Sequence, residues 1–349
     1  MIRVTLKPAI IGIILAVSAL LSAHAAGAGM PMPSKNDFSS KAYSYRTDSP
    51  EPEMQSLVAS GMPAARRTDG LAYVRSVVST IRAATGDEFM QVKMAHDFIA
   101  LTIEYDGPAY LSGNIPPQDF ISVLRRGTAV CEGFANTFKT FCDELGVKCK
   151  VVHGYSRGTG FNLESEDGSK PSSNHAWNIV SIKGKKYLVD CTWDEGYMNG
   201  STTTREYKTE WLFAAPETFI YSHYPTDSRS NQLLANKVSW KEFVSLPSLR
   251  PSFFDAVRKC HSKLGRLNKC KGKLELELKL AESYSMSVSV TNSSTGESVR
   301  GCYAIKTDGD KTVLTFSFPQ PGTYKVTFFP HRPGASKSTS CGEFLVRRE

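Results

Sequence analysis

The sequence predicts an α+β domain followed by a small all-β sandwich. Three observations indicate this class: helical periodicity in the first half of the chain, a strand pair joined at Lys183-Gly184, and an apolar period of two from Leu274 onward. At 349 residues the chain is long enough for two such units. An apolar content of 41% and a charged content of 22% are ordinary for a protein with a buried core.

The first 25 residues are typical of a signal peptide. Arg3 and Lys7 form a basic start, an apolar run covers 9–21, and Ala23-His24-Ala25 fits the small-x-small cleavage pattern. We therefore expect an exported protein, secreted or periplasmic, with no integral membrane segment after cleavage; retention as an uncleaved anchor is the alternative. Residues 26–68 are rich in Pro, Ser, Gly and Met without a sustained period, which predicts a flexible leader.

The next segment, 69–255, has the pattern of the α+β domain. Apolar residues recur at helical spacing over 71–81, and Gly86 ends this run. A second helix is predicted over 89–102. A loop with two prolines and a short amphipathic helix over 119–126 follow it.

A further helix is predicted after Gly127, with Cys131 in its first turn. Thr128 is the expected N-cap, which places Cys131 at about the third helical position, and Gly146 is the expected end of the helix. A cysteine there meets the positive end of the helix dipole and unpaired backbone N–H groups, and both favour the thiolate. The same N–H groups suit an oxyanion. A lone cysteine, however, is more often a buried packing residue.

Residues 175–182 and 186–193 are predicted to form a hairpin. With a two-residue turn at Lys183-Gly184, residue 175 faces residue 192, so His175 and Asp190 become diagonal neighbours on one face. A loop of three residues would separate them. A cysteine, a histidine and an aspartate in this order are the parts of a thiol nucleophile, its base and the group that orients the base. The Cys and His spacings do not suit a zinc site.

Residues 256–273 are predicted to be a basic linker. Much of the net charge of +8 gathers there, in Arg258, Lys259, Lys263, Arg266, Lys269, Lys271 and Lys273. Such a cluster is either a solvated linker or a surface for an acidic polymer or the cell envelope. Aromatic residues do not interleave with these charges, so nucleic acid is not an expected partner. Residues 274–349 then alternate apolar and polar positions between turns, which predicts the sandwich.

Export would place eight cysteines in a compartment that permits disulfides. Cys302–Cys341 and Cys260–Cys270 are conceivable pairs, although spacing alone does not determine connectivity. The hypothesis of a thiol nucleophile requires that Cys131 stay unpaired.

Three blocks, at 126–135, 174–178 and 187–193, resemble the transglutaminase-like superfamily. The continuation at 211–225 and 246–254 resembles its kyphoscoliosis-peptidase branch. The resemblance covers roughly residues 70 to 255. It implies a papain-like core, in which a helix with the nucleophile packs on an antiparallel sheet, and an Ig-like character for the sandwich fits such a chain.

By this resemblance Cys131 is the nucleophile, His175 the general base and acid, and Asp190 the residue that orients it. No cofactor and no metal are needed. Gln118 and Tyr105 are candidate side-chain oxyanion donors. His153 and His223 are expected to be structural, and Trp177 and Trp193 to pack beside the site.

The leading hypothesis is an exported cysteine peptidase or acyltransferase that acts on amides of a protein or peptide substrate. The alternative is a non-catalytic adhesion or scaffold protein that uses the core and the sandwich as binding surfaces. Thiol redox work is less favoured, because no Cys-x-x-Cys is present.

Overall fold

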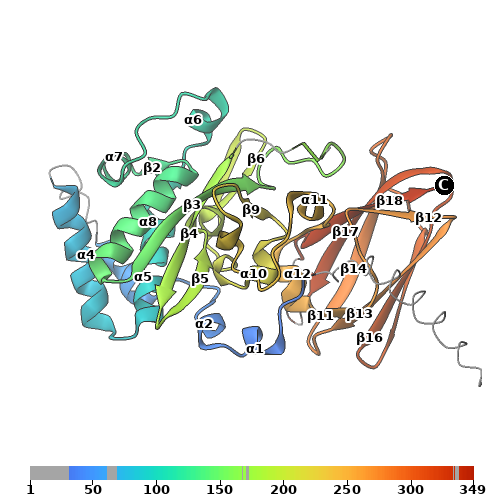
Figure 1. Ribbon diagram of the computed structural model, residues 1–349, viewed down its shortest axis with the longest axis horizontal. Coiled ribbons are helices and arrows are strands. Elements are labelled where there is room, and N and C mark those ends of the chain that lie inside the picture. Colours follow the sequence, from blue (N-terminus) through green and yellow to red (C-terminus); the bar gives the residue numbers. More distant parts are fainter. Residues whose placement is uncertain (1–30, 61–68, 167, 170–172, 333, 335–337) are drawn as a thin grey trace, which may run out of the picture.

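The computed structural model describes residues 31–60, 69–166, 168–169, 173–332, 334 and 338–349. The chain has an α+β core at one end and a β-sandwich at the other, with short helices between them (Figure 1). The predicted signal peptide, 1–25, lies outside the described residues. Within the part that the structure describes, none of the helices combines the length and the apolar character needed to cross a membrane.

The predicted helices of the core are present. They are α4 (Gly70–Ala84), α5 (Glu88–Thr102), α7 (Phe120–Arg126) and α8 (Cys131–Leu145). Three begin at an aspartate whose carboxylate accepts backbone N–H bonds from the first turn, namely Asp69, Asp87 and Asp119. Gly146 ends α8 in the left-handed region, at φ 80°, as predicted.

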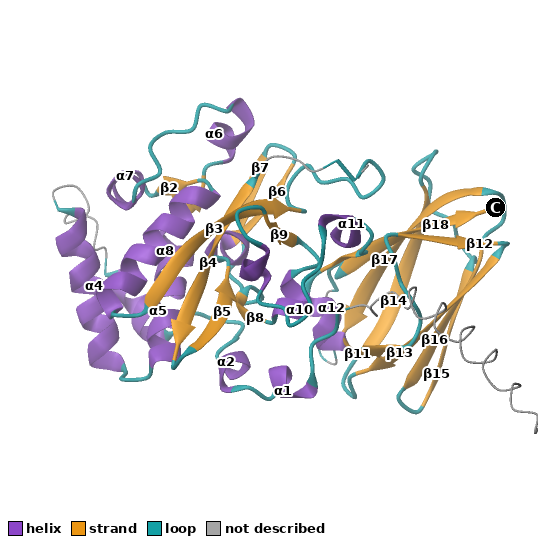
Figure 2. Ribbon diagram, in the orientation of Figure 1, coloured by secondary structure: helices purple, strands orange, loops and turns teal. Residues whose placement is uncertain are grey.

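A five-stranded antiparallel sheet supports α8. Its order is β8-β5-β4-β3-β9, with bounds Leu212–Ala214, Lys185–Val189, His175–Ile182, Lys148–Ser156 and His223–Pro225. Lys183 and Gly184 both have positive φ and form a two-residue turn that pairs Ile182 with Lys185. The predicted even register is therefore confirmed. Figure 2 shows α8 lying along this sheet. Phenylalanines of α8 enter the same apolar core as strand residues of the sheet.

The second strand of the hairpin is shorter than predicted. Strand β5 ends at Val189, and Cys191–Glu195 form helix α9. Asp190 is the N-cap of α9, because its carboxylate accepts the N–H groups of Thr192 and Trp193. An acidic side chain that bonds the backbone two and three residues ahead thus ends the strand.

The start of α8 also differs from the prediction. Thr128 is not the N-cap: Thr128–Ala129 form a short strand, β2, parallel to β1 (Glu104–Tyr105). Val130 is the N-cap, so Cys131 is the first residue of the helix rather than the third. Strand pairing at residues 128 and 129 moved the helix start, and the cysteine remains in the first turn.

The described part of the predicted leader is not a free tail. Residues 31–60 contain α1 (Lys35–Phe38), α2 (Lys41–Ser44) and α3 (Pro52–Ala59). Ala42 and Met54 are buried in the core, and the Tyr43 hydroxyl donates to Asp255 over 2.8 Å. The prediction of a flexible leader was wrong here because helices of four to eight residues are too short to show a sustained period.

The sandwich consists of two sheets. One has the order β10-β18-β17-β14, with β12 beside β18; the other has the order β11-β13-β16-β15. The bounds are Ser248–Leu249 for β10, Val257–Cys260 for β11, Leu267–Cys270 for β12, Lys273–Leu280 for β13, Ser285–Asn292 for β14, Tyr303–Asp308 for β15, Lys311–Ser317 for β16, Gly322–His331 for β17 and Gly342–Arg348 for β18. The fold class is confirmed.

The predicted basic linker is part of this sandwich. Strands β11 and β12 lie within 256–273 and pair with β13 and β18. Several of the cations have partners: the guanidinium of Arg258 lies 4.1 Å from the ring centre of Phe38, and Lys269 forms an ion pair with Glu349. The charges therefore belong to edge strands whose intervening residues pack inward.

The remaining elements connect these layers. They are α6 (Gly107–Ser112), β6 (Gly196–Asn199), β7 (Thr202–Arg205), α10 (Pro216–Phe219), η2 (Arg229–Gln232), α11 (Trp240–Phe243) and α12 (Pro251–Ala256). The capping box at Ser239 and Glu242 that opens α11 is present.

A buried arginine ties the core to the segment that leads into the sandwich. The Arg157 guanidinium forms an ion pair with Glu166 at 2.7 Å. It also donates to four backbone carbonyls, those of Tyr221, Phe243, Leu246 and Pro247. One cation at the end of β3 thus fixes several loops at once.

All eight cysteines are free thiols in the structure. The conceivable pairs Cys302–Cys341 and Cys260–Cys270 are not formed, and Cys260 and Cys270 lie on strands of different sheets. Cys142 has no exposed surface.

Candidate active site

Cys131 is placed by the packing around the start of α8. The Gln118 side-chain carbonyl accepts the N–H of Val130 at 3.0 Å, and its amide nitrogen donates to the Pro116 carbonyl at 2.8 Å. A Cβ at Gly133 would lie 2.4 Å from Gln118 Oε1, so only glycine allows this approach. Both polar ends of Gln118 are engaged with the backbone, so Gln118 supports the helix start instead of serving as an oxyanion donor.

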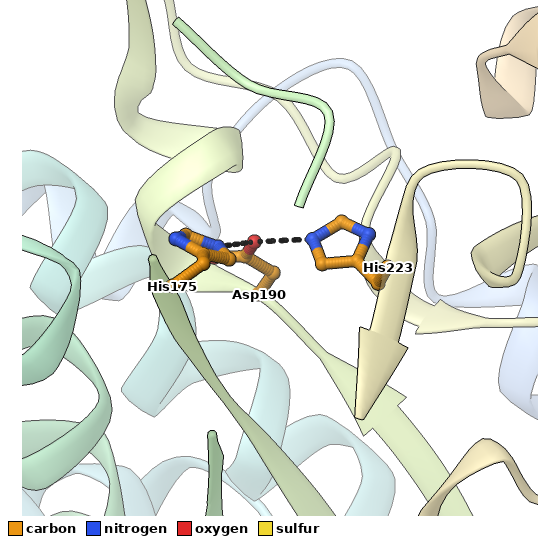
Figure 3. A group of neighbouring side chains, drawn as sticks. All are labelled: His175, Asp190 and His223. Atoms are coloured by element: carbon orange, nitrogen blue, oxygen red, sulfur yellow. Dashed lines mark hydrogen bonds and ion pairs between the residues drawn. The ribbon is translucent and has the colours of Figure 1, made fainter. Parts of the chain in front are cut away.

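His175 and Asp190 meet at the edge of the sheet. His175 Nε2 lies 2.7 Å from Asp190 Oδ2, and both side chains are buried (Figure 3). The other oxygen of Asp190 accepts the N–H groups that begin α9, at 2.9 and 3.3 Å. The cap therefore holds the carboxylate in place. His175 uses Nε2 for Asp190, so Nδ1 is the nitrogen left for Cys131, which is near enough to raise the pKa of His175.

The surroundings favour the imidazolium form of His175. Burial by itself lowers the pKa of His175, but the charge of Asp190 and the contact with Cys131 outweigh it and raise this pKa to about 10. Burial likewise raises the pKa of Asp190, yet His175 and then His223 hold it well below its usual range. A carboxylate that stays ionised beside a protonated imidazole stabilises a thiolate next to them.

A second histidine contacts the same carboxylate. His223 comes from β9, and its Nε2 lies 3.1 Å from Asp190 Oδ2 (Figure 3). Its Nδ1 lies 2.8 Å from the Ser222 hydroxyl. The sequence predicted only a structural role for His223. No local sequence pattern indicates the sheet order that places β9 beside β3.

Aromatic rings enclose this group. The ring centres of Trp193 and Phe219 lie 4.4 and 4.0 Å from that of His223, and Trp177 is fully buried beside both histidines. These ring contacts agree with the packing role expected for Trp177 and Trp193. Rings that exclude water strengthen the interactions between the charged groups inside them.

His175, Asp190 and His223 each place one possible ligand atom within 4.8 Å of the others, as the residues of a metal site would. Here both Nε2 atoms are bonded to one oxygen of Asp190, and the remaining nitrogen of His175 serves Cys131. The arrangement is a hydrogen-bonded chain that runs from the thiol to Ser222.

A cleft of about 390 Å³ opens from His175 toward the sandwich. Tyr105, Asn174 and Trp193 line it on the side of the core, and Arg250 and Glu343 on the side of the sandwich. Pairing of β1 with β2 sets Tyr105 opposite Ala129, close to Cys131. Burial and then the charge of Cys131 raise the pKa of Tyr105, so its hydroxyl stays protonated and remains a candidate donor.

A thiol at a helix start, an imidazole on a strand and a buried carboxylate define the class of the core. The family model of the transglutaminase-like superfamily matches residues 75–190, and a KY-like, immunoglobulin-like domain matches residues 240–349. The chain therefore contains a domain of the transglutaminase-like superfamily, followed by a KY-like, immunoglobulin-like domain.

The two matched domains and the similarity to kyphoscoliosis peptidases agree with the branch that the sequence blocks predicted. The chain is 26% identical to the kyphoscoliosis peptidase of Mus musculus over 73% of this chain and 38% of that protein, and 26% identical to that of Homo sapiens over 72% and 37%. It is also 28% identical to Hillarin of Drosophila melanogaster over 40% of this chain and 18% of that protein. The chain thus spans about two fifths of the length of the two kyphoscoliosis peptidases.

Proposed function

We propose that the chain is an exported thiol-dependent peptidase or acyltransferase that acts on amide bonds of a protein or peptide. The observation that carries this proposal is the buried His175–Asp190 pair at 2.7 Å, with Cys131, at the start of α8, near enough to raise the pKa of His175. Export rests on the N-terminal sequence pattern alone.

In the proposed mechanism the Cys131 thiolate attacks the carbonyl carbon of the amide. In the first turn of α8 the N–H of Gly133 donates to the Val130 carbonyl, whereas those of Cys131 and Glu132 have no backbone acceptor and would hold the developing oxyanion. His175, protonated at Nδ1, gives this proton to the leaving amine. Asp190 stays ionised throughout and keeps the ring oriented through Nε2.

The second half of the reaction releases the acyl group. His175, now neutral, takes a proton from water in hydrolysis or from an amine in transfer, and the acyl–sulfur bond breaks. The cleft beside His175 offers room for a chain segment as acceptor or substrate. Its walls come from both domains, which supports a role for the sandwich in substrate binding.

Exposed lysines on β11 and directly after β12 support a second part of the proposal, contact with an acidic polymer or an envelope surface. Lys259 and Lys271 are exposed, and no ion pair is found for them within the described residues. Such contact would hold the enzyme near its substrate, and its salt dependence would follow from screening.

Mass spectrometry of a mixed pool of peptides and amines tests the proposed chemistry. The pool is incubated with the protein and with Cys131→Ala, and cleavage, deamidation and crosslinking are scored together. Products formed only with the unaltered protein support the proposal and identify the acceptor. Equal product patterns for the two proteins would favour the alternative, a scaffold that binds without catalysis.

A further inference from the structure

His223 and Ser222 extend the site beyond the three residues that the chemistry needs. The chain of contacts runs from Cys131 through His175 and Asp190 to His223 and then Ser222. His175 on β4 and His223 on β9 therefore share one oxygen of the buried Asp190 carboxylate. Strand β3 lies between these two strands. The mechanism proposed above uses only the first of these histidines.

The protonation of His223 follows from its two neighbours. An ionised Asp190 can only accept, so Nε2 of His223 must carry the proton and donate it. Nδ1 is then an acceptor, and the Ser222 hydroxyl at 2.8 Å is placed to donate to it. Ser222 thus selects the tautomer that suits the carboxylate.

The electrostatics around His223 agree with a neutral ring. Burial lowers the pKa of His223, and although Asp190 opposes this, the pKa falls to about 4. The titratable groups that face the ring are Asp190 and His175; the other close neighbours are aromatic rings of Trp193, Trp211 and Phe219. His223 therefore remains a neutral donor across the pH range in which the thiol pair works.

We propose that His223 is a positioning residue of this site: it fixes the shared oxygen of Asp190 so that His175 presents Nδ1 to Cys131. This role rests on the proposed function of the pair, and it goes beyond it by adding a fourth residue. Without His223, Asp190 keeps its cap to α9 through one oxygen, while the oxygen that holds His175 has a single partner. The cap still holds Oδ1, but Oδ2 can then turn about this fixed oxygen, and the imidazole of His175 follows it.

The test measures how fast iodoacetamide alkylates Cys131, by mass spectrometry of the peptide that contains it. His223→Phe keeps a ring but removes the donor, and His223→Gln keeps an N–H near the position of Nε2. We expect the Phe variant to react at least about tenfold more slowly at pH 7.5, the scale of one lost hydrogen bond to a charged group. The Gln variant should recover to within about threefold of the unaltered protein.

The order of the two variants separates positioning from packing. If His223 only filled space, Phe would be the better substitute and Gln the worse, because the neighbours are aromatic. A Phe variant as fast as the unaltered protein, or a Gln variant as slow as Phe, overturns the role. His331, which also contacts a serine hydroxyl but lies on the sandwich, provides the matched control; His331→Phe should leave the rate unchanged.

Ser222→Ala covers the case in which both His223 variants fail to fold, as judged by circular dichroism. It removes only the hydroxyl that selects the tautomer, and a rate about three- to tenfold lower is expected; an unchanged rate overturns the proposal. The alkylation assay needs no substrate turnover. If Cys131 of the unaltered protein is alkylated no faster than a free cysteine, the proposed function fails. If it is alkylated faster than a free cysteine, and equally fast in the His223→Phe variant, only the role of His223 is overturned.

Discussion

Replacing Asp190 with asparagine should deprive Cys131 of its activated partner while keeping the local fold. Asparagine is nearly the same size, and its amide oxygen can still accept the N–H groups of Thr192 and Trp193 that begin α9. Its amide nitrogen would face His175 Nε2 as a donor. His175 would then carry its proton on Nδ1 even when neutral, so it could not accept a proton from Cys131.

The size of the effect follows from the pKa of His175. This pKa is about 10, against about 6.5 for an ordinary histidine, and Asp190 is the leading cause that raises it. Without that charge, only Cys131 opposes the effect of burial, and the pKa of His175 falls. A smaller fraction of His175 is then protonated at pH 7.5. The alkylation rate of Cys131 should fall by about tenfold or more.

The assay is iodoacetamide labelling of Cys131 between pH 6 and pH 10, followed by mass spectrometry. The unaltered protein should keep a high rate through neutral pH, and Asp190→Asn should lose it. Asp143→Asn, an exposed carboxylate near the far end of α8, is the control and should match the unaltered protein. Equal rates for Asp190→Asn and the unaltered protein at pH 7.5 would refute the reasoning.

Two further predictions concern stability. Arg157→Met should lower the free energy of unfolding in urea by about 3–5 kcal/mol, because Glu166 and four carbonyls lose a buried cation. Lys139→Met, which removes an exposed ion pair, is the control and should cost less than about 0.5 kcal/mol. A loss below about 1 kcal/mol for Arg157→Met would contradict the role of Arg157 in holding these loops together. Burial lowers the pKa of buried His96, but Asp194 and Asp97 outweigh it and raise this pKa to about 9. The stability that His96 provides is therefore complete below about pH 6.5 and is lost as pH rises toward 9. Denaturation at several pH values should show a shallower decline between pH 6.5 and 9 for His96→Asn than for the unaltered protein, and parallel slopes would argue against it.

Local signals in the sequence were enough to predict the hairpin and the proximity of His175 to Asp190. Lys183-Gly184 determines a two-residue turn, and the turn determines the register that brings His175 near Asp190. Caps and end glycines likewise located the helices of the core. The helix start at Cys131 shifted by two residues because β1 and β2 pair across the chain, which the local sequence does not show.

The parts that sequence missed depend on distant contacts. His223 reaches Asp190 only because β9 is the outer neighbour of β3, an order set by packing of the whole sheet. The helices within 31–60 are held by groups far along the chain, such as Asp255. The basic segment forms strands because β13 and β18 supply partners. In each case the segment is too short or too charged for its own pattern to indicate its structure.

The N-terminal helices have a practical consequence for anyone who trims this chain. Besides the contacts of Ala42, Met54 and Tyr43, the Tyr221 hydroxyl donates to the Pro31 carbonyl at 2.9 Å. A recombinant protein that begins where the family match begins, at residue 75, would lack these N-terminal contacts and part of α4. Its exposed core would favour aggregation, and its inactivity would say nothing about Cys131.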